Sequence, residues 1–277
     1  MWPHINILGS TISVYGLLMV VAGFAAWLVV IVLSKTKKWV PSSDANLAYL
    51  VGLCGGIIGA FLLRPIIKIF EVIIRWQRYD FAGIGDFFSY IFGEIVFYGG
   101  FIGGLIAIII FCRKLKIKIV PLFDIFAPAL AFAHAIGRLG CLLGGCCFGL
   151  EVSPTHPFSI IYPPISLSAP PGIPLLAVPL IEAVFLFALA IVLVIVCLVR
   201  KKPGLSASIY LLVYPIGRFI LEYFRGDIVR GSFWMFSTSQ IISVFVFVFG
   251  VVYFIRITRN AKMSAPEQVS IRDDDAV

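Results

Sequence analysis

The chain has 277 residues, of which 61% are hydrophobic and only 13% are charged, and its mean hydropathy is +1.05. A soluble domain cannot bury that much apolar surface, so the composition excludes this class and predicts an all-α integral membrane protein. The formal net charge is +8. The basic residues are dispersed between apolar runs, a pattern that is typical of topology signals and that excludes nucleic acid as a partner.

Seven apolar runs are long enough to cross roughly 30 Å of hydrocarbon as helices. They lie near residues 12–34, 46–70, 92–112, 120–136, 174–199, 206–222 and 238–256. The opening residues "MWPHINILGSTISVYG" lack the basic segment and the cleavage site of a signal peptide, so we expect the first run to be retained. We therefore predict about seven transmembrane helices in one polytopic domain, residues 1–257.

Compact basic clusters follow the first, third, fifth and seventh runs. They begin at Lys35, Arg113, Arg200 and Arg256. Because such clusters stay on the cytoplasmic side of a membrane, the N-terminus is predicted to lie outside and the C-terminus in the cytoplasm. Residues 138–173 then form an external loop region. The polar segment 258–277 is predicted to be a disordered cytoplasmic tail.

Charged residues gather at the external ends of the later runs. Arg218, Glu222 and Arg225 are spaced four and three apart, which places them on one helix face. They form either a self-neutralising patch at the headgroup level or a basic site whose surplus positive charge receives a phosphate. In a membrane protein, a phospholipid headgroup supplies that phosphate. Arg138 ends the fourth run and Glu182 lies early in the fifth, where a charge usually faces a protein interior.

The stretch "FYGGFIGG" in the third run contains two glycine pairs at helical spacing. They are Gly99 with Gly100 and Gly103 with Gly104. Such pairs indicate either close packing of helices or a face that admits a lipid chain, and the sequence leaves both readings open.

Three cysteines lie in the stretch "GRLGCLLGGCCFG": Cys141, Cys146 and Cys147. Their spacing is not a zinc pattern and the adjacent pair is expected to point in different directions, so we predict no metal and no other cofactor. Because the predicted loop faces an oxidising compartment, a disulfide from Cys141 to Cys146 or Cys147 is favoured. A reactive thiol beside Arg138 and simple apolar packing are the alternatives.

These residues also match a family. In order, the similar stretches are "ISVYGLLM", "GGIIGA", "FYGGFIGGLI", "DIFAPALAFAHAIGRLG", "VPLIEA", "RFILEYFRGD" and "STSQIIS". Through them the chain resembles the bacterial phosphatidylglycerol–prolipoprotein diacylglyceryl transferases along nearly its whole length. The resemblance implies a multi-pass transferase of the bacterial cytoplasmic (inner) membrane. Its substrates would be phosphatidylglycerol and the lipobox cysteine of a prolipoprotein, and glycerol phosphate would leave.

The resemblance also implies the roles of individual residues. Arg138, with Arg218 or Arg225, would hold the phosphodiester and stabilise the leaving phosphate. Tyr98, His134 or the lipid phosphate would take the proton of the acceptor thiol. The implied substrate-binding residues are Tyr15, Gly99, Gly100, Gly140, Gly149, Glu182, Glu222 and Arg225.

Three positions depart from the family pattern. Tyr98 stands in place of a histidine, Cys141 in place of an asparagine, and Cys146 in place of an acid. A tyrosine, with a pKa of about 10, is a poor base at neutral pH. Two alternatives to the default reaction follow. One is a phospholipid-binding or lipid-transport protein that has lost catalysis, and the other is a transferase with a different acceptor.

Overall fold

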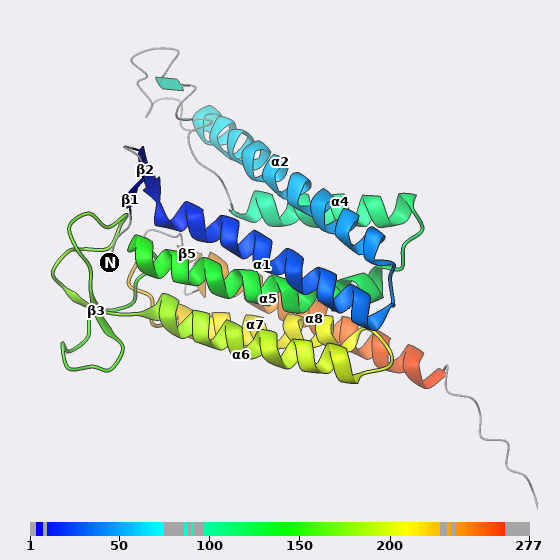
Figure 1. Cartoon of the computed structure of the whole chain (residues 1–277). Coiled ribbons are helices and arrows are strands. Elements are labelled where there is room, and N and C mark those ends of the chain that lie inside the picture. The colour runs from blue at the N-terminus through cyan, green and yellow to red at the C-terminus, as the bar shows by residue number, and fades with distance from the viewer. Residues whose placement is uncertain are drawn as a thin grey trace, which may run out of the picture. The chain divides into compact units, whose positions relative to one another are not determined.

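The computed structural model describes residues 4–7, 10–74, 86–87, 90, 97–227, 232–233 and 236–263. Within these residues a helix lies at each of the seven predicted spans (Figure 1). The helices are α1 (Val14–Lys37), α2 (Ser42–Ile74), α4 (Phe97–Lys114), α5 (Ile119–Gly144), α6 (Val178–Val199), α7 (Leu205–Glu222) and α8 (Thr238–Met263). All of them except α4 are long and apolar enough to cross a membrane over their described residues. The prediction of a helical, multi-pass membrane protein is confirmed, and its orientation stays a prediction.

Short antiparallel strand pairs lie before α1 and in two of the connections between helices. They are β1 (His4–Ile7) with β2 (Ser10–Ser13), β3 (Ser159–Ile161) with β4 (Pro174–Leu176), and β5 (Ser232–Phe233) with β6 (Phe236–Ser237). The pair β3–β4 belongs to the long connection between α5 and α6, which is otherwise irregular.

Two predicted boundaries are wrong. Helix α5 continues to Gly144, so residues 138–144 belong to a helix and not to the predicted loop. Its glycines did not end it because they lie at a helix contact: a Cβ added to Gly140 would lie 3.1 Å from Tyr15 Cδ2 of α1. Helix α8 likewise continues to Met263, so the start of the predicted tail is helical, and residues 264–277 lie outside the described residues.

The chain divides into two compact units where one domain was predicted. The first unit comprises residues 1–26 and 123–277, and the second comprises residues 27–122. In the second unit α2 and α4 pack through glycines. A Cβ added to Gly103 would lie only 2.8 Å from the Cα atom of Gly59. Hydrogen in place of a side chain therefore lets the two backbones approach closely, as is common between membrane helices.

In the first unit α5, α6 and α7 share a core of small and aliphatic residues, and α7 also packs against α8. The core residues are Ala127, Ala131, Leu189, Ala190, Leu193 and Ala207. Large apolar side chains such as Val184 and Phe245 are exposed on the outer faces of these helices. Exposed apolar surface on this scale suits lipid and not water.

One end of the first unit is held together by a buried carboxylate. Asp124, near the start of α5, accepts hydrogen bonds from the backbone N–H groups of Gly204 (2.8 Å) and Ala207 (2.7 Å) at the start of α7. Gly204 in turn lies against Ile257 of α8. The basic stretches that follow α6 and end α8 are therefore at the same end of the unit, as the predicted orientation requires. Arg138 lies about 21 Å further along α5, since a helix rises about 1.5 Å per residue.

Candidate active site: an arginine–carboxylate network

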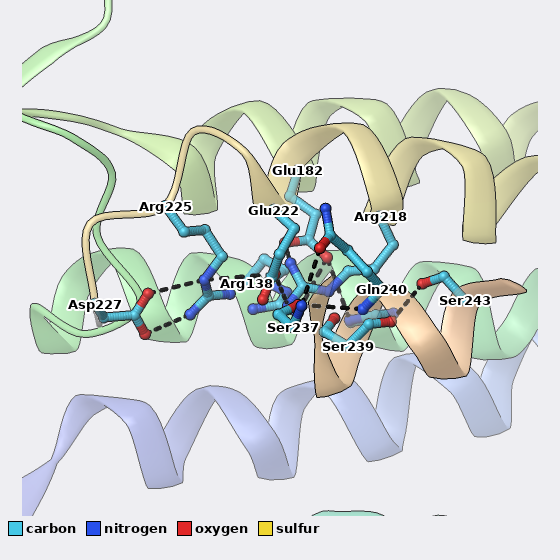
Figure 2. Close-up of polar contacts among 11 residues, drawn as sticks. Arg138, Glu182, Arg218, Glu222, Arg225, Asp227, Ser237, Ser239, Gln240 and Ser243 are labelled. Atoms are coloured by element: carbon cyan, nitrogen blue, oxygen red, sulfur yellow. Dashed lines mark hydrogen bonds and ion pairs between the residues drawn. The ribbon is translucent and has the colours of Figure 1, made fainter. Parts of the chain in front are cut away.

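Glu182 of α6 is the centre of a network of buried charges (Figure 2). Its side chain is 1% exposed, and its Oε1 atom lies 3.0 Å from Nη2 of Arg138 on α5. Its Oε2 atom lies 4.0 Å from Nη1 of Arg218 on α7. His134, one helical turn before Arg138, places Nε2 4.0 Å from Glu182 Oε1. Three helices thus bring two of the predicted arginines and the predicted histidine to one carboxylate.

The network continues along α7 and past its end. Arg218 Nη2 lies 2.6 Å from Glu222 Oε2, and Arg225 Nε lies 3.9 Å from the same oxygen. Arg225 also donates two hydrogen bonds, of 2.9 and 2.6 Å, to the two carboxylate oxygens of Asp227. This is the bidentate geometry for which a guanidinium is suited.

Asp227 changes the charge balance that the sequence predicted. Three arginines in the network face three carboxylates, so these six residues lack the surplus of positive charge that one of the two alternatives from the sequence assumed. Burial opposes the charge of Arg225, but the hydrogen bonds to Asp227 outweigh it and raise the pKa of this guanidinium above its ordinary value. Arg225 therefore stays charged at any physiological pH.

Several guanidinium nitrogens of the network are nevertheless available to a ligand. Arg138 Nε, Arg218 Nη1 and Arg225 Nη1 are buried, and none has a hydrogen-bond partner among the described residues. A buried donor without an acceptor is costly, and a guanidinium carries five N–H donors. An oxyanion with several oxygens, such as a phosphate, supplies the missing acceptors from one group. The arrangement can bind an anion although its charges are balanced.

The backbone at Arg225 is held by the connection after α5. Leu150 N–H donates to Phe224 O (2.9 Å), and Gly226 N–H donates to Phe148 O (3.1 Å). Gly149, between these bonds, pairs with Arg225, and a Cβ on it would lie 2.7 Å from the side chain of Val178. Gly149 was predicted to bind substrate, and the structure shows it in backbone packing beside Arg225.

Tyr15 and Gly140 lie together at the edge of the network. The ring of Tyr15 covers Gly140, and its hydroxyl is within electrostatic reach of Arg138. The Tyr15 side chain is exposed over about a third of its surface, 36%. The structure thus brings two of the predicted substrate-binding residues beside the arginines.

Tyr98, Gly99 and Gly100 belong to α4 in the second unit. The side chain of Tyr98 lies outside the described part of the chain. A Cβ on Gly99 would meet the carbonyl oxygen of Gly59, and one on Gly100 would lie 3.4 Å from that of Gly56. Both glycines therefore face α2, which is the close helix packing that the sequence offered as one reading. Their part in substrate binding stays a prediction.

The predicted disulfide is wrong. The structure contains no disulfide among Cys141, Cys146 and Cys147, yet their sulfur atoms all lie within 4.8 Å of one another. The expectation that the adjacent cysteines point apart is wrong as well. Cys147 has a φ of +60°, and this left-handed backbone turns its side chain back toward the other two thiols.

Comparisons with known proteins support the resemblance. A family model described as "Prolipoprotein diacylglyceryl transferase" matches residues 3–256. The chain belongs to this family. Three relatives carry the name phosphatidylglycerol–prolipoprotein diacylglyceryl transferase, the first of them with the number 2. The one from Clostridium perfringens is 36% identical over 207 residues, 75% of this chain and 76% of its own. Those from Clostridium tetani and Finegoldia magna are 33% and 29% identical, over 90% and 89% of this chain and 94% and 92% of their own.

Two further polar features, one on α7 and one at the start of α8, were not predicted from the sequence. Tyr214 contacts the ring of His134 edge-on, at 5.0 Å between ring centroids, and is hydrogen-bonded to Arg138. Its position four residues before Arg218, on the same face of α7, was the available signal. Gln240 and Ser237 exchange hydrogen bonds of 3.0 and 3.2 Å at the start of α8 (Figure 2). They form a capping box, whose S-x-x-Q signature is legible in "STSQ".

Proposed function

We propose that this protein transfers the diacylglyceryl group of phosphatidylglycerol to the cysteine thiol of a prolipoprotein, in the cytoplasmic membrane of a bacterium. Family membership and the names of the relatives support the reaction. The observation that carries the proposal is the set of buried guanidinium nitrogens of Arg138, Arg218 and Arg225 without a hydrogen-bond partner among the described residues. Arginine forks suit the oxygens of a phosphodiester.

In this proposal the acceptor sulfur attacks a glyceryl carbon of the lipid. A C–S bond forms while the bond between that glyceryl carbon and the phosphate oxygen breaks. Glycerol phosphate leaves with the electron pair of the broken C–O bond. Arg138, Arg218 and Arg225 stabilise the charge that develops on the leaving phosphate. Glu182 and Glu222 orient these guanidiniums, with which they form ion pairs of 3.0 and 2.6 Å.

The thiol proton requires a base. His134 is the candidate that the geometry favours, because it lies one turn from Arg138 and 4.0 Å from Glu182. Tyr98 and the lipid phosphate are the other candidates from the sequence. A His134→Gln variant keeps a hydrogen-bonding side chain but removes the base, so we expect a rate loss of about 100-fold or more, the usual share of acid–base catalysis. Tyr98→Phe should then have a small effect.

The experiment for the proposal is complementation of a bacterium depleted of its own diacylglyceryl transferase. We expect the wild-type chain to restore growth. Arg218→Lys should fail, because a point charge does not replace a bidentate fork. Arg113→Lys is the matched control, since Arg113 is exposed at the end of α4 and should tolerate the same change. Absence of growth with a normally inserted wild-type chain would refute the default reaction and favour a different acceptor or loss of catalysis.

A further inference from the structure

The end of α5 brings two thiols together through its backbone geometry. Gly145 has a φ of +70°, and the N–H of Cys146 donates to the carbonyl oxygen of Cys141 (3.0 Å). This is the six-to-one hydrogen bond of a Schellman motif, in which the residue after the glycine contacts the last turn of the helix. Cys141 and Cys146 occupy the two contacting positions of that motif.

The third thiol joins them at a cost in backbone energy. Cys147 adopts a φ of +60°, a strained conformation for a residue other than glycine, which persists only where the surrounding structure imposes it. The neighbouring pair of Gly149 with Arg225 holds the chain in place just beyond this turn. The result is three sulfur atoms within 4.8 Å of one another, with Cys141 and Cys147 buried.

Two guanidiniums and a phenol lie near the three thiols. Arg225 is within electrostatic reach of Cys147, and Arg138 is within electrostatic reach of Cys141 and Cys147. Tyr162 is 1% exposed, and its hydroxyl has no hydrogen-bond partner among the described residues. It is close enough to Cys146 to interact with its charge. A buried phenol without an acceptor beside these sulfurs is an independent sign that a further group belongs there.

We propose that Cys141, Cys146 and Cys147 bind one soft metal cation, Zn²⁺ or Cu⁺, as thiolates. Thiolates prefer such ions over Mg²⁺ or Ca²⁺. With a Zn–S distance of about 2.3 Å, three sulfurs around one zinc ion lie about 3.8 Å apart, within reach of small side-chain rotations from the observed cluster. Three S–H bonds break, three metal–sulfur bonds form, and the three protons go to solvent, with no change of oxidation state. Binding of the metal by these three cysteines does not depend on the proposed transferase reaction.

The test uses the full-length chain, purified in detergent under argon with a phosphine reductant. In a background of Cys54→Ala, Cys112→Ala and Cys197→Ala, the cluster contains the remaining cysteines of the chain. Zn²⁺ and Cu⁺ are each titrated in competition with a chromophoric chelator for that ion. We expect one ion per chain with a Kd below about 1 µM, a value typical of specific binding. The tighter of the two ions identifies the natural class.

Single serine variants identify the ligands. We expect each single variant to lower the affinity for the metal by at least about 100-fold: Cys141→Ser, Cys146→Ser and Cys147→Ser. A residue that only hydrogen-bonds to a metal ligand typically costs about 10–100-fold when it is changed. Cys54→Ser in the otherwise native chain is the matched control, because Cys54 is exposed on α2. Thermal unfolding shows that each variant is folded, and the metal should raise the midpoint of the native chain and of Cys54→Ser but not that of the three cluster variants. Undiminished affinity in any cluster variant, no binding in the background, or a disulfide among the three cysteines in protein alkylated directly from membranes would overturn the proposal.

Discussion

Replacing Glu182 by Gln tests the electrostatic design of the network, because it keeps the shape of the side chain and removes its charge. Glu182 is buried, and it is the ion-pair partner of Arg138 among the described residues. Breaking a buried pair by removing one partner costs about 3–5 kcal/mol. Arg218 keeps its contact with Glu222 at 2.6 Å, so the loss falls mainly on Arg138, and we expect the lower end, about 3 kcal/mol.

Thermal unfolding in detergent measures this effect. For chains of 150–250 residues, 1 kcal/mol shifts the midpoint by about 2–4 °C, so Glu182→Gln should lower it by about 6–12 °C. Glu151→Gln is the matched control. Glu151 is exposed and forms no ion pair within the described ranges, so its change should stay within about 0.5 kcal/mol. Adding Arg138→Met to Glu182→Gln should recover stability, because no unpaired charge is left on α5. Equal midpoints for the two glutamine variants would refute the reasoning.

Two further predictions concern the packing of each unit. Asp124→Asn should cost about 1.5–3 kcal/mol, because an amide has one acceptor oxygen for the N–H groups of Gly204 and Ala207; an unchanged unfolding midpoint would contradict this. Gly103→Val should destabilise the contact of α2 with α4 by about 1–3 kcal/mol through overpacking. Its control is Gly16→Ala, where an added Cβ meets no atom within 4 Å, and a loss of stability in both variants would contradict the packing argument.

The spans were predictable because hydrocarbon thickness and hydropathy decide them with little help from tertiary structure. The end of α5 was not, because the meaning of glycine depends on what lies next to it. Gly140 lies under the ring of Tyr15 and is a packing residue, whereas Gly145, five positions on, takes the left-handed conformation that ends the helix. The two glycines look alike in the sequence. The residue that gives Gly140 its different role is Tyr15 of α1, more than a hundred residues away in the chain.

In the site, the arginines and glutamates were predictable from helical spacing and from the family resemblance, and their partners were less so. Asp227 lies outside α7, so the periodicity that connects Arg218 with Glu222 does not extend to it. The pairing of Arg225 with Asp227 depends on the turn that follows the helix, which is held by backbone hydrogen bonds to Phe148 and Leu150. Long-range backbone contacts of this kind leave no local pattern in the sequence.

The departures from the family pattern have a different meaning once their positions are known. Cys141 and Cys146 replace residues that the resemblance expects near the reacting groups, which raised doubt about catalysis. In the structure the ion pairs of the network join arginines to Glu182, Glu222 and Asp227, with no contribution from a residue at 141 or 146. The two cysteines instead form a separate cluster with Cys147 beside Arg225. The ion pairs of the network therefore do not include an acid at position 146, and the cysteines at 141 and 146 belong to a cluster of thiols beside these pairs.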